Sequence, residues 1–283
     1  LIIGMIIYKS TPIIDRFFLS SLSSGSISYV NYANKLFLAL SQIISLSIAI
    51  PSFPLLAKLA TEISSNNEFQ KKISKIINTI LLLTVPISVY LLINSNFFIH
   101  LFFERGKFTS LDTENVSNCF SIYVLALPIS CVSTIVAQGF YALKNTITPV
   151  IIGFFEILLY LILSFLFVPK YGFIAIPVIY FVYFLFSHTC LWFILSKKLK
   201  LNFYSYYFSL LKIVIISVIS LTPIIIYKSF ITTNGNIIIQ IFLGISYCTL
   251  FFLLSKFIKN EELTELTQLL LSKIKWIKIK KNE

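Results

Sequence analysis

Most of this chain consists of apolar stretches about as long as a membrane-spanning helix, separated by short polar connectors. A helix needs roughly 20 apolar residues to cross the hydrocarbon core of a bilayer, within a range of about 17–25. The pattern therefore predicts an all-α fold, a polytopic transmembrane helix bundle of about eight spans. The expected spans cover residues 1–22, 28–60, 76–94, 116–143, 149–168, 173–195, 208–227 and 237–254.

Composition supports a membrane protein and argues against a soluble enzyme or a nucleic-acid-binding protein. Only 12% of the 283 residues are charged and the mean hydropathy is +0.90, whereas an average soluble domain carries about 25% charged residues. The net charge of +12 resides mostly at the ends of apolar runs, so no nucleic-acid partner is predicted. The sequence shows no P-loop, nucleophile motif or Cys/His cluster, so we predict no enzyme activity, no cofactor and no transition-metal site.

Lys and Arg are distributed unevenly between alternate connectors, and positive charge favours the cytoplasmic side of a membrane. One set of connectors (58–75, 144, 197–200 and 256–281) holds fifteen Lys residues, whereas the other set holds four cations. We therefore expect the first set and the C-terminus to be cytoplasmic, and the second set, with the loop 104–112, to be external. The external cations are Arg105, Lys107, Lys170 and Lys228.

Four charged residues near the N-terminus lie in or beside apolar runs. Asp15 and Arg16 fall inside the run 13–22, Lys35 opens a run that continues to residue 56, and Lys9 precedes Arg16 by about two helical turns. A charge at bilayer depth costs roughly 2.5–3.5 kcal/mol, so such residues usually face a protein interior or a water-filled cavity. We predict that Arg16, Lys35 and Lys9 form a cationic cavity. The alternative for Lys9 and Lys35 is that each snorkels to a membrane interface.

The two acids of interest, Asp15 and Glu156, each need a partner. Asp15 and Arg16 are adjacent and diverge by about 100° on a helix, so they do not pair face to face. Asp15 is either an ion ligand or part of a structural ion pair with Arg16 or Lys35. Glu156 has no cation near it in sequence, so it either coordinates a cation or proton or bonds to a neighbouring helix. Tyr160 lies one turn beyond Glu156 and is expected on the same face.

Three segments together resemble the MurJ/MviN family of lipid II flippases, in the multidrug/oligosaccharidyl-lipid/polysaccharide exporter superfamily. The first, Ile14 to Leu22 followed by Gly25 to Leu36, resembles the join of that family's seventh and eighth helices. The second, Leu101 to Thr109 plus Asp112, resembles its external loop. The third combines Gly139-Phe140-Tyr141-Ala142-Leu143 with Thr148-Pro149-Val150 and resembles a further signature. Order and spacing agree across residues 1 to about 200.

The resemblance implies a protein of two lobes plus two extra helices in the bacterial inner membrane. Residues 1–200 would be the six-helix C-terminal lobe, 201–258 the two additional helices and 259–283 a cytoplasmic amphipathic tail. Because the chain begins at Leu1 within an apolar run, we expect the N-terminal lobe to be missing. The family moves an undecaprenyl-diphosphate-linked peptidoglycan precursor across the membrane by alternating access. Cavity cations hold the diphosphate, and a groove at the last two helices takes the lipid tail.

The resemblance also suggests roles for individual residues. Lys35 falls where the family has an essential Arg after Asp, but here the pair reads Asn34-Lys35, so the charge survives without the bidentate fork. Asp15 resembles an acid through which some members bind sodium, and Glu156 with Tyr160 are further ion-binding candidates. Sodium or proton coupling would then drive transport.

Two other functions stay open. One is an O-antigen or polysaccharide-unit flippase of the same superfamily, which the departure at Asn34-Lys35 keeps in view. The other is a membrane scaffold that does not transport. The basic run 273–281 of the tail either binds anionic membrane lipids or is a solvated cytoplasmic flank.

Overall fold

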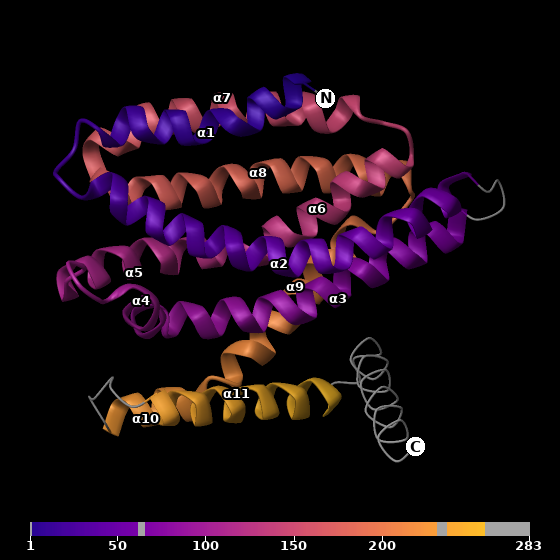
Figure 1. The fold of residues 1–283 in the computed structure, drawn as a ribbon. Coiled ribbons are helices and arrows are strands. Elements are labelled where there is room, and N and C mark those ends of the chain that lie inside the picture. The colour runs from indigo at the N-terminus through magenta and orange to yellow at the C-terminus, as the bar shows by residue number, and fades with distance from the viewer. Residues whose placement is uncertain (1, 62–65, 231–236, 258–283) are drawn as a thin grey trace, which may run out of the picture.

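The computed structural model describes residues 2–61, 66–230 and 237–257, and within these ranges every regular element is a helix (Figure 1). The all-α prediction is therefore confirmed. The elements are α1 (Ile2–Leu19), α2 (Ser26–Thr61), α3 (Asn66–Ile93), α4 (Ser95–Phe103), α5 (Ser110–Leu125), α6 (Leu127–Ala142), α7 (Ile147–Tyr171), the short 3-10 turn η1 (Gly172–Ile174), α8 (Ala175–Lys198), α9 (Phe203–Ile219), α10 (Thr222–Phe230) and α11 (Ile237–Phe257).

Among the described residues, five helical stretches are long and apolar enough to cross a membrane, and a bent pair, α5 with α6, makes a sixth. The longest stretch, Ile147–Lys198, holds both α7 and α8, which pack side by side (Figure 1). A polytopic bundle is thus established, whereas the count of eight spans stays a prediction. The five single stretches are Ser26–Thr61, Asn67–Ile93, Ile147–Lys198, Tyr206–Tyr227 and Ile238–Lys256.

Two expected spans are broken rather than continuous. The span expected over 116–143 is α5 and α6, which meet at Ala126 with a bend of 42°, because Pro128 opens α6 and favours the first turn of a helix. The span expected over 208–227 is α9 and α10, separated at Ser220 and Leu221 ahead of Pro223. Both corrections follow from proline, which cannot donate the backbone hydrogen bond that would continue a helix.

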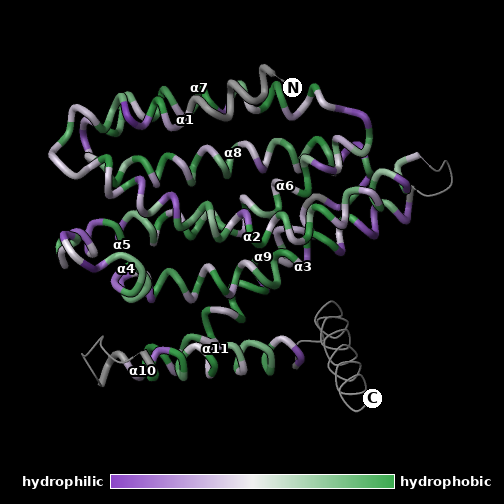
Figure 2. Tube along the Cα trace, viewed as in Figure 1, coloured by the Kyte–Doolittle hydropathy of each residue, from purple (hydrophilic) through white to green (hydrophobic). Residues whose placement is uncertain are grey.

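The connectors gather at two opposite ends of the bundle, as alternating spans require. Figure 1 places the α1–α2 turn, the α4–α5 connection and the α7–α8 turn at one end. The end of α2, the start of α3, the α6–α7 connection and the end of α8 lie at the other. Figure 2 shows that hydrophilic residues concentrate toward these ends, whereas the helix centres are hydrophobic. The arrangement agrees with the two sets of connectors distinguished by charge; which end is cytoplasmic stays a prediction.

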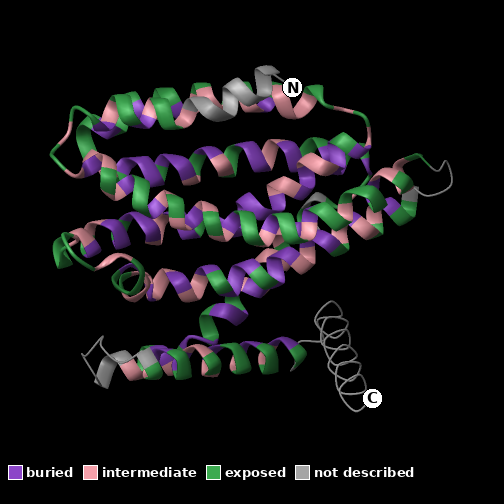
Figure 3. Cartoon of the chain, in the orientation of Figure 1, coloured by how far each residue is buried: buried purple, intermediate pink, exposed green. Residues whose placement is uncertain are grey.

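Helix α8 lies at the centre of the bundle, and its burial contrasts with the outer helices (Figure 3). Trp192 and Leu195 of α8 are buried, whereas Phe154 and Phe165 of α7 are more than half exposed. Large apolar side chains on the outer surface fit a bundle that sits in lipid, since exposed apolar patches of this extent mark interaction or membrane surfaces. The predicted division into 1–200, 201–258 and 259–283 stays a prediction, and the predicted tail lies outside the described residues.

Helix α6 approaches α3 and α8 most closely at Gly139. A Cβ atom at this position would lie 2.7 Å from Ile73 Cδ1 and 3.2 Å from Leu195 Cδ2. Both distances are shorter than ordinary van der Waals contact, so the helices can pack this closely only because residue 139 has no side chain. This explains why a glycine opens the Gly139-Phe140-Tyr141-Ala142-Leu143 segment.

We expect Gly139→Val to lower the free energy of unfolding by roughly 1–3 kcal/mol, the usual cost of overpacking a core. The measurement is unfolding of the purified protein in detergent, followed by circular dichroism. Ala137→Val, a change on the half-buried side of the same helix, is the control and should lose less. Equal stability of the Gly139→Val variant and the wild type would contradict the close packing.

Candidate functional site

Asp15 and Tyr160 join α1 to α7 in the interior of the bundle. Asp15 is 9% exposed and Tyr160 is 1% exposed, and the Tyr160 hydroxyl donates a hydrogen bond to Asp15 Oδ1. No ion pair of Asp15 with Arg16 or Lys35 occurs in the described part of the chain, so that structural alternative is wrong. A buried carboxyl must have a hydrogen-bond partner, and here the partner is a neutral hydroxyl from another helix.

Glu156 makes a second link of the same kind, between α7 and α8. Its Oε2 accepts a hydrogen bond of 2.9 Å from Ser187 Oγ, and Ser187 is buried. Glu156 and Tyr160 lie one turn apart in α7, about 40° from each other around the helix axis. The Tyr160 hydroxyl bonds to Asp15 of α1, while its ring and Glu156 both contact α8, through Tyr183 and Ser187. Each acid has one hydroxyl partner. The ion-binding role of both remains a prediction.

A chain of tyrosine rings continues from this site across the interior. The ring centroids of Tyr160 and Tyr183 lie 5.0 Å apart, those of Tyr183 and Tyr180 lie 5.1 Å apart, and those of Tyr180 and Tyr123 lie 5.1 Å apart. Tyr123 stacks on Phe37 of α2 at 5.6 Å. The Tyr123 hydroxyl is buried and has no hydrogen-bond partner among the described residues. Edge-to-face aromatic pairs of this kind stabilise helix contacts by about 0.5–1.5 kcal/mol each.

The predicted cavity cations do not meet inside the bundle. Arg16 and Lys35 are both exposed, whereas Glu156 lies between α7 and α8. The described helices therefore do not by themselves enclose these three residues in one chamber. The side chain of Lys9 lies outside the described residues. The role of Arg16, Lys35 and Lys9 in binding substrate remains a prediction, and any chamber they share must be open on the exposed face of α1 and α2.

Sequence reasoning missed a stripe of polar residues on the exposed face of α2. Ser28, Asn31, Lys35 and Gln42 are all exposed, and at 3.6 residues per turn they fall within about 60° of one another around the helix axis. The opposite face of α2 packs against α5 and α6. The signal was present in the sequence as polar residues at helical spacing within an apolar run. We name these four residues the α2 stripe.

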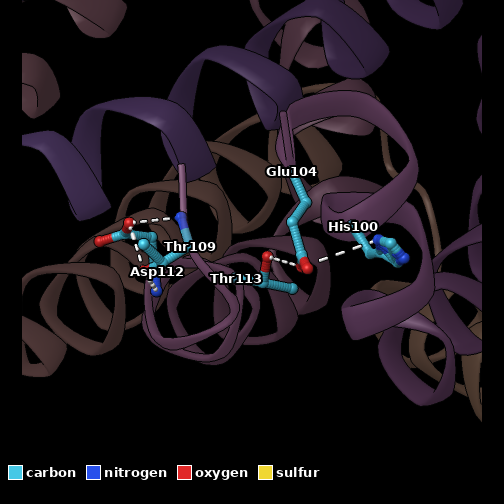
Figure 4. Close-up of polar contacts among 5 residues, drawn as sticks. All are labelled: His100, Glu104, Thr109, Asp112 and Thr113. Carbon is cyan, nitrogen blue, oxygen red and sulfur yellow. Dashed lines mark hydrogen bonds and ion pairs between the residues drawn. The ribbon is translucent and has the colours of Figure 1, made fainter. Parts of the chain in front are cut away.

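The connection between α4 and α5 is held by two local polar contacts, shown in Figure 4. Thr109 caps α5 in a capping box with Asp112: the Thr109 backbone N–H donates to Asp112 Oδ2 at 2.8 Å. Glu104 accepts a hydrogen bond from the hydroxyl of Thr113 and lies 3.7 Å from His100 Nδ1. The capping box explains why α5 begins at Ser110, before the residue 116 expected from hydropathy.

A further buried polar contact links α6 to α8. Ser133 Oγ lies 3.0 Å from His188 Nδ1, and His188 is 1% exposed. The His188 ring packs against Tyr206 of α9 with centroids 5.2 Å apart. Side-chain hydrogen bonds thus join several pairs of described helices: α1 with α7, α7 with α8, α6 with α8, and also α2 with α6 and α3 with α5.

Together, the apolar exterior, the alternating ends and the polar contacts between helices define a polytopic membrane protein. The family model for the lipid II flippase MurJ matches residues 1–260. The chain therefore belongs to the MurJ family of lipid II flippases, as the resemblance predicted.

Relatives and a solved structure agree with this assignment. The probable lipid II flippase MurJ of Bdellovibrio bacteriovorus is 28% identical over 171 residues, which cover 60% of this chain and 32% of that protein. The corresponding protein of Borreliella burgdorferi is 25% identical over 79% of this chain and 44% of its own length. The inward closed conformation of lipid II flippase MurJ matches with a TM-score of 0.75 and 26% identity, over 91% of this chain and 53% of that chain. This chain thus spans about half or less of the proteins it matches.

We expect Tyr160→Phe to lower the free energy of unfolding by about 1–3 kcal/mol, because it leaves the buried Asp15 carboxyl without its donor. Thermal unfolding in detergent measures the loss. Tyr171→Phe removes an exposed hydroxyl from the same helix and should change stability little. If both variants unfold like the wild type, the Asp15–Tyr160 contact does not hold α1 to α7.

Proposed function

We propose that this helix bundle forms one lobe of a lipid II flippase, which moves an undecaprenyl-diphosphate-linked peptidoglycan precursor across the bacterial inner membrane by alternating access. Family membership supports the substrate. The match over 53% of a solved chain of that name supports a role as one lobe, with a second lobe opposite. The C-terminal, Lys-rich end of the bundle would be cytoplasmic. The protein acts as a transporter and not as an enzyme.

The observation that carries this proposal is the α2 stripe. Polar and charged side chains facing acyl chains would be costly, so the stripe must face water or another part of the protein. A lipid II flippase needs such a surface, because the hydrophilic head of its substrate must cross the bilayer without entering hydrocarbon. Lys35 lies in the middle of the stripe and would hold the diphosphate as a point charge.

Buried acids would couple transport to an ion. Asp15 and Glu156 each accept only one hydroxyl hydrogen bond among the described contacts, so each carboxyl keeps acceptor capacity for a sodium ion or a proton. Both lie on helix α1 or α7, which pack together. Binding at either acid would change the contact between these helices, which gives the ion a route to bias one state of the lobe.

A polysaccharide-unit flippase of the same superfamily is the second candidate. The specific observation in its favour is Asn34-Lys35 in place of the acid and arginine expected in the family. Asn34 Oδ1 is buried without a partner among the described residues, so the amide replaces an acid at a position that packs against neighbouring helices. A lysine binds phosphate without the planar fork of arginine, which would suit a different diphosphate-linked sugar.

We predict that Lys35→Ala in the full-length protein abolishes growth in cells depleted of their own lipid II flippase. The substitution removes the only cation in the α2 stripe. Lys35→Arg keeps a positive charge at this position and should therefore support growth. Immunoblots of membrane fractions check that each variant is present.

The matched control is Ile43→Ala, an exposed residue of α2 outside the stripe, which should grow normally. Normal growth of Lys35→Ala would remove the stripe from the mechanism. If the wild type supports O-antigen export but not cell-wall synthesis, the second candidate replaces the first; if it supports neither, the chain does not transport.

Glu156→Gln separates charge from hydrogen bonding at the second acid. Glutamine keeps a carbonyl oxygen that accepts from Ser187, so we expect stability within about 0.5 kcal/mol of the wild type but loss of sodium- or proton-dependent transport in vesicles. Ser187→Ala is the comparison: it should keep ion dependence and lose stability. Ion-dependent transport by Glu156→Gln at the wild-type rate would show that this acid is structural.

A further inference from the structure

A pocket of about 600 Å³ opens between the α1–α2 turn and the α4–α5 connection. Gly25, Ser28, Tyr29 and Tyr32 line one side, and residues of the α4–α5 connection line the other. The volume falls within the range of roughly 300–1,000 Å³ typical of ligand sites and exceeds what a bare ion requires. From the distribution of Lys and Arg we expect this end of the bundle to be the external one.

The pocket has an excess of positive charge, because two cations and one carboxylate line it. Arg105 and Lys107 both line it and are exposed, and neither forms a salt bridge among the described residues. One Arg105 nitrogen, Nη2, donates to the Phe102 carbonyl at 2.7 Å, which leaves most of the guanidinium donors free. The acid that lines the pocket, Asp112, is held in the capping box by Thr109 and offsets only one of the two cations.

The nearby acid Glu104 does not compensate these cations. Its carboxylate accepts from Thr113 and lies beside His100 (Figure 4), and it is not among the residues that line the pocket. Gly106 separates the two cations and has a φ of +65°, a conformation that glycine adopts without strain. The turn therefore places two cations on one small loop and turns the adjacent acid to another partner.

Aromatic rings form the apolar wall of the pocket. The centroids of Tyr32 and Phe103 lie 5.1 Å apart, those of Tyr32 and Phe108 lie 5.6 Å apart, and those of Phe103 and Phe108 lie 6.1 Å apart. The faces of such rings attract the C–H groups of a sugar ring, because the ring carries a negative face. Cations beside aromatic rings thus suit a sugar that bears an anionic group.

The pocket also joins the α2 stripe. Ser28 lines the pocket and is the first residue of the stripe, and Lys35 lies about 10 Å further along the helix, at 1.5 Å per residue. A head group that leaves Lys35 toward the external end of α2 would therefore reach this pocket next. This continuity favours a transported glycan over a lipid headgroup that enters from the bilayer.

We propose that this pocket, with Arg105 and Lys107 beside Tyr32, Phe103 and Phe108, is an external binding site for the anionic sugar head of the transported lipid-linked glycan. The identity of the ligand rests on the proposed function; the anionic-sugar chemistry rests on the pocket itself. The site would hold the head group after it leaves the α2 stripe and would disfavour its return. No covalent bond changes in this step.

Binding of a soluble sugar to the full chain in phosphatidylcholine nanodiscs tests the site. The probe is a disaccharide with one carboxylate, N-acetylglucosaminyl-N-acetylmuramic acid, and its matched control is the same disaccharide with the carboxylate reduced to an alcohol. Calorimetry measures Kd for the wild type, for Arg105→Gln with Lys107→Gln, for Tyr32→Leu and for Lys170→Gln. Lys170 is an exposed cation expected at the same end but outside the pocket.

We expect the wild type to bind the acidic probe at least about fivefold more tightly than the reduced one. The double variant should lose about tenfold or more, the usual effect of charge-assisted hydrogen bonds. Tyr32→Leu should also weaken binding, and Lys170→Gln should not. Higher ionic strength should weaken binding of the acidic probe by the wild type, because exposed charges are screened.

The proposal would be overturned if the wild type did not bind the acidic probe, or if the double variant bound it as tightly as the wild type. It would also be overturned if a low mole fraction of phosphatidylglycerol in the nanodisc displaced the probe, because the pocket would then bind a lipid headgroup. The test needs no transport, so its outcome is separate from that of the proposed function. If Lys35→Ala grows normally but the probe still binds, the pocket is a glycan site and the α2 stripe plays no part in transport. If Lys35→Ala abolishes growth but the probe does not bind, the protein is a flippase without this site.

Discussion

Placing a charged side chain against acyl chains at the bilayer centre costs roughly 2.5–3.5 kcal/mol. The arrangement of polar side chains in this bundle follows from that cost. Asp15 and Glu156 lie within apolar helices, and each has a hydroxyl partner from a different helix, Tyr160 in one case and Ser187 in the other. Within the described ranges the α2 stripe has no such partners and lies exposed, so that face must meet water or another part of the protein. The same constraint thus separates the buried polar contacts from the surface where a hydrophilic head group could travel.

The buried contacts and the close packing have different consequences for motion. Gly139 lets α6 pack closely against α3 and α8, and close packing resists relative movement of these helices. Helix α1, by contrast, is attached to α7 through the Asp15–Tyr160 hydrogen bond in an interface that titration or ion binding could change. A lobe with a rigid centre and an adjustable edge is suited to alternating access, in which one part rocks against another around a binding site. The pocket lined by Arg105 and Lys107 lies beside α1, where the α1–α2 turn meets the α4–α5 connection.

Hydropathy was sufficient to predict the helical bundle, because helix length in a membrane is set by bilayer thickness. The family was predicted from three sequence segments, and the two ends of the bundle from the distribution of Lys and Arg. Hydropathy did not predict the breaks at Ala126 and Ser220, where proline acts locally within an apolar run. It also could not identify partners, since Ser187 is far from Glu156 in sequence and only packing brings them together. For the same reason it could not identify Tyr160 of α7 as the hydrogen-bond partner of Asp15 on α1. The α2 stripe could have been read from spacing alone.

Thiol labelling of α2 in intact cells tests the central claim that the stripe faces an aqueous cavity. Single cysteines at Ser28, Asn31, Lys35 and Gln42, and at the exposed apolar residue Ile43, would be placed in a variant whose native cysteines are serine. We predict that a membrane-impermeant maleimide reacts with the stripe positions, and that a saturating lipid-linked substrate slows reaction at Lys35→Cys, while Ile43→Cys stays unlabelled. Equal labelling at all five positions, or labelling at Ile43 alone, would contradict the claim.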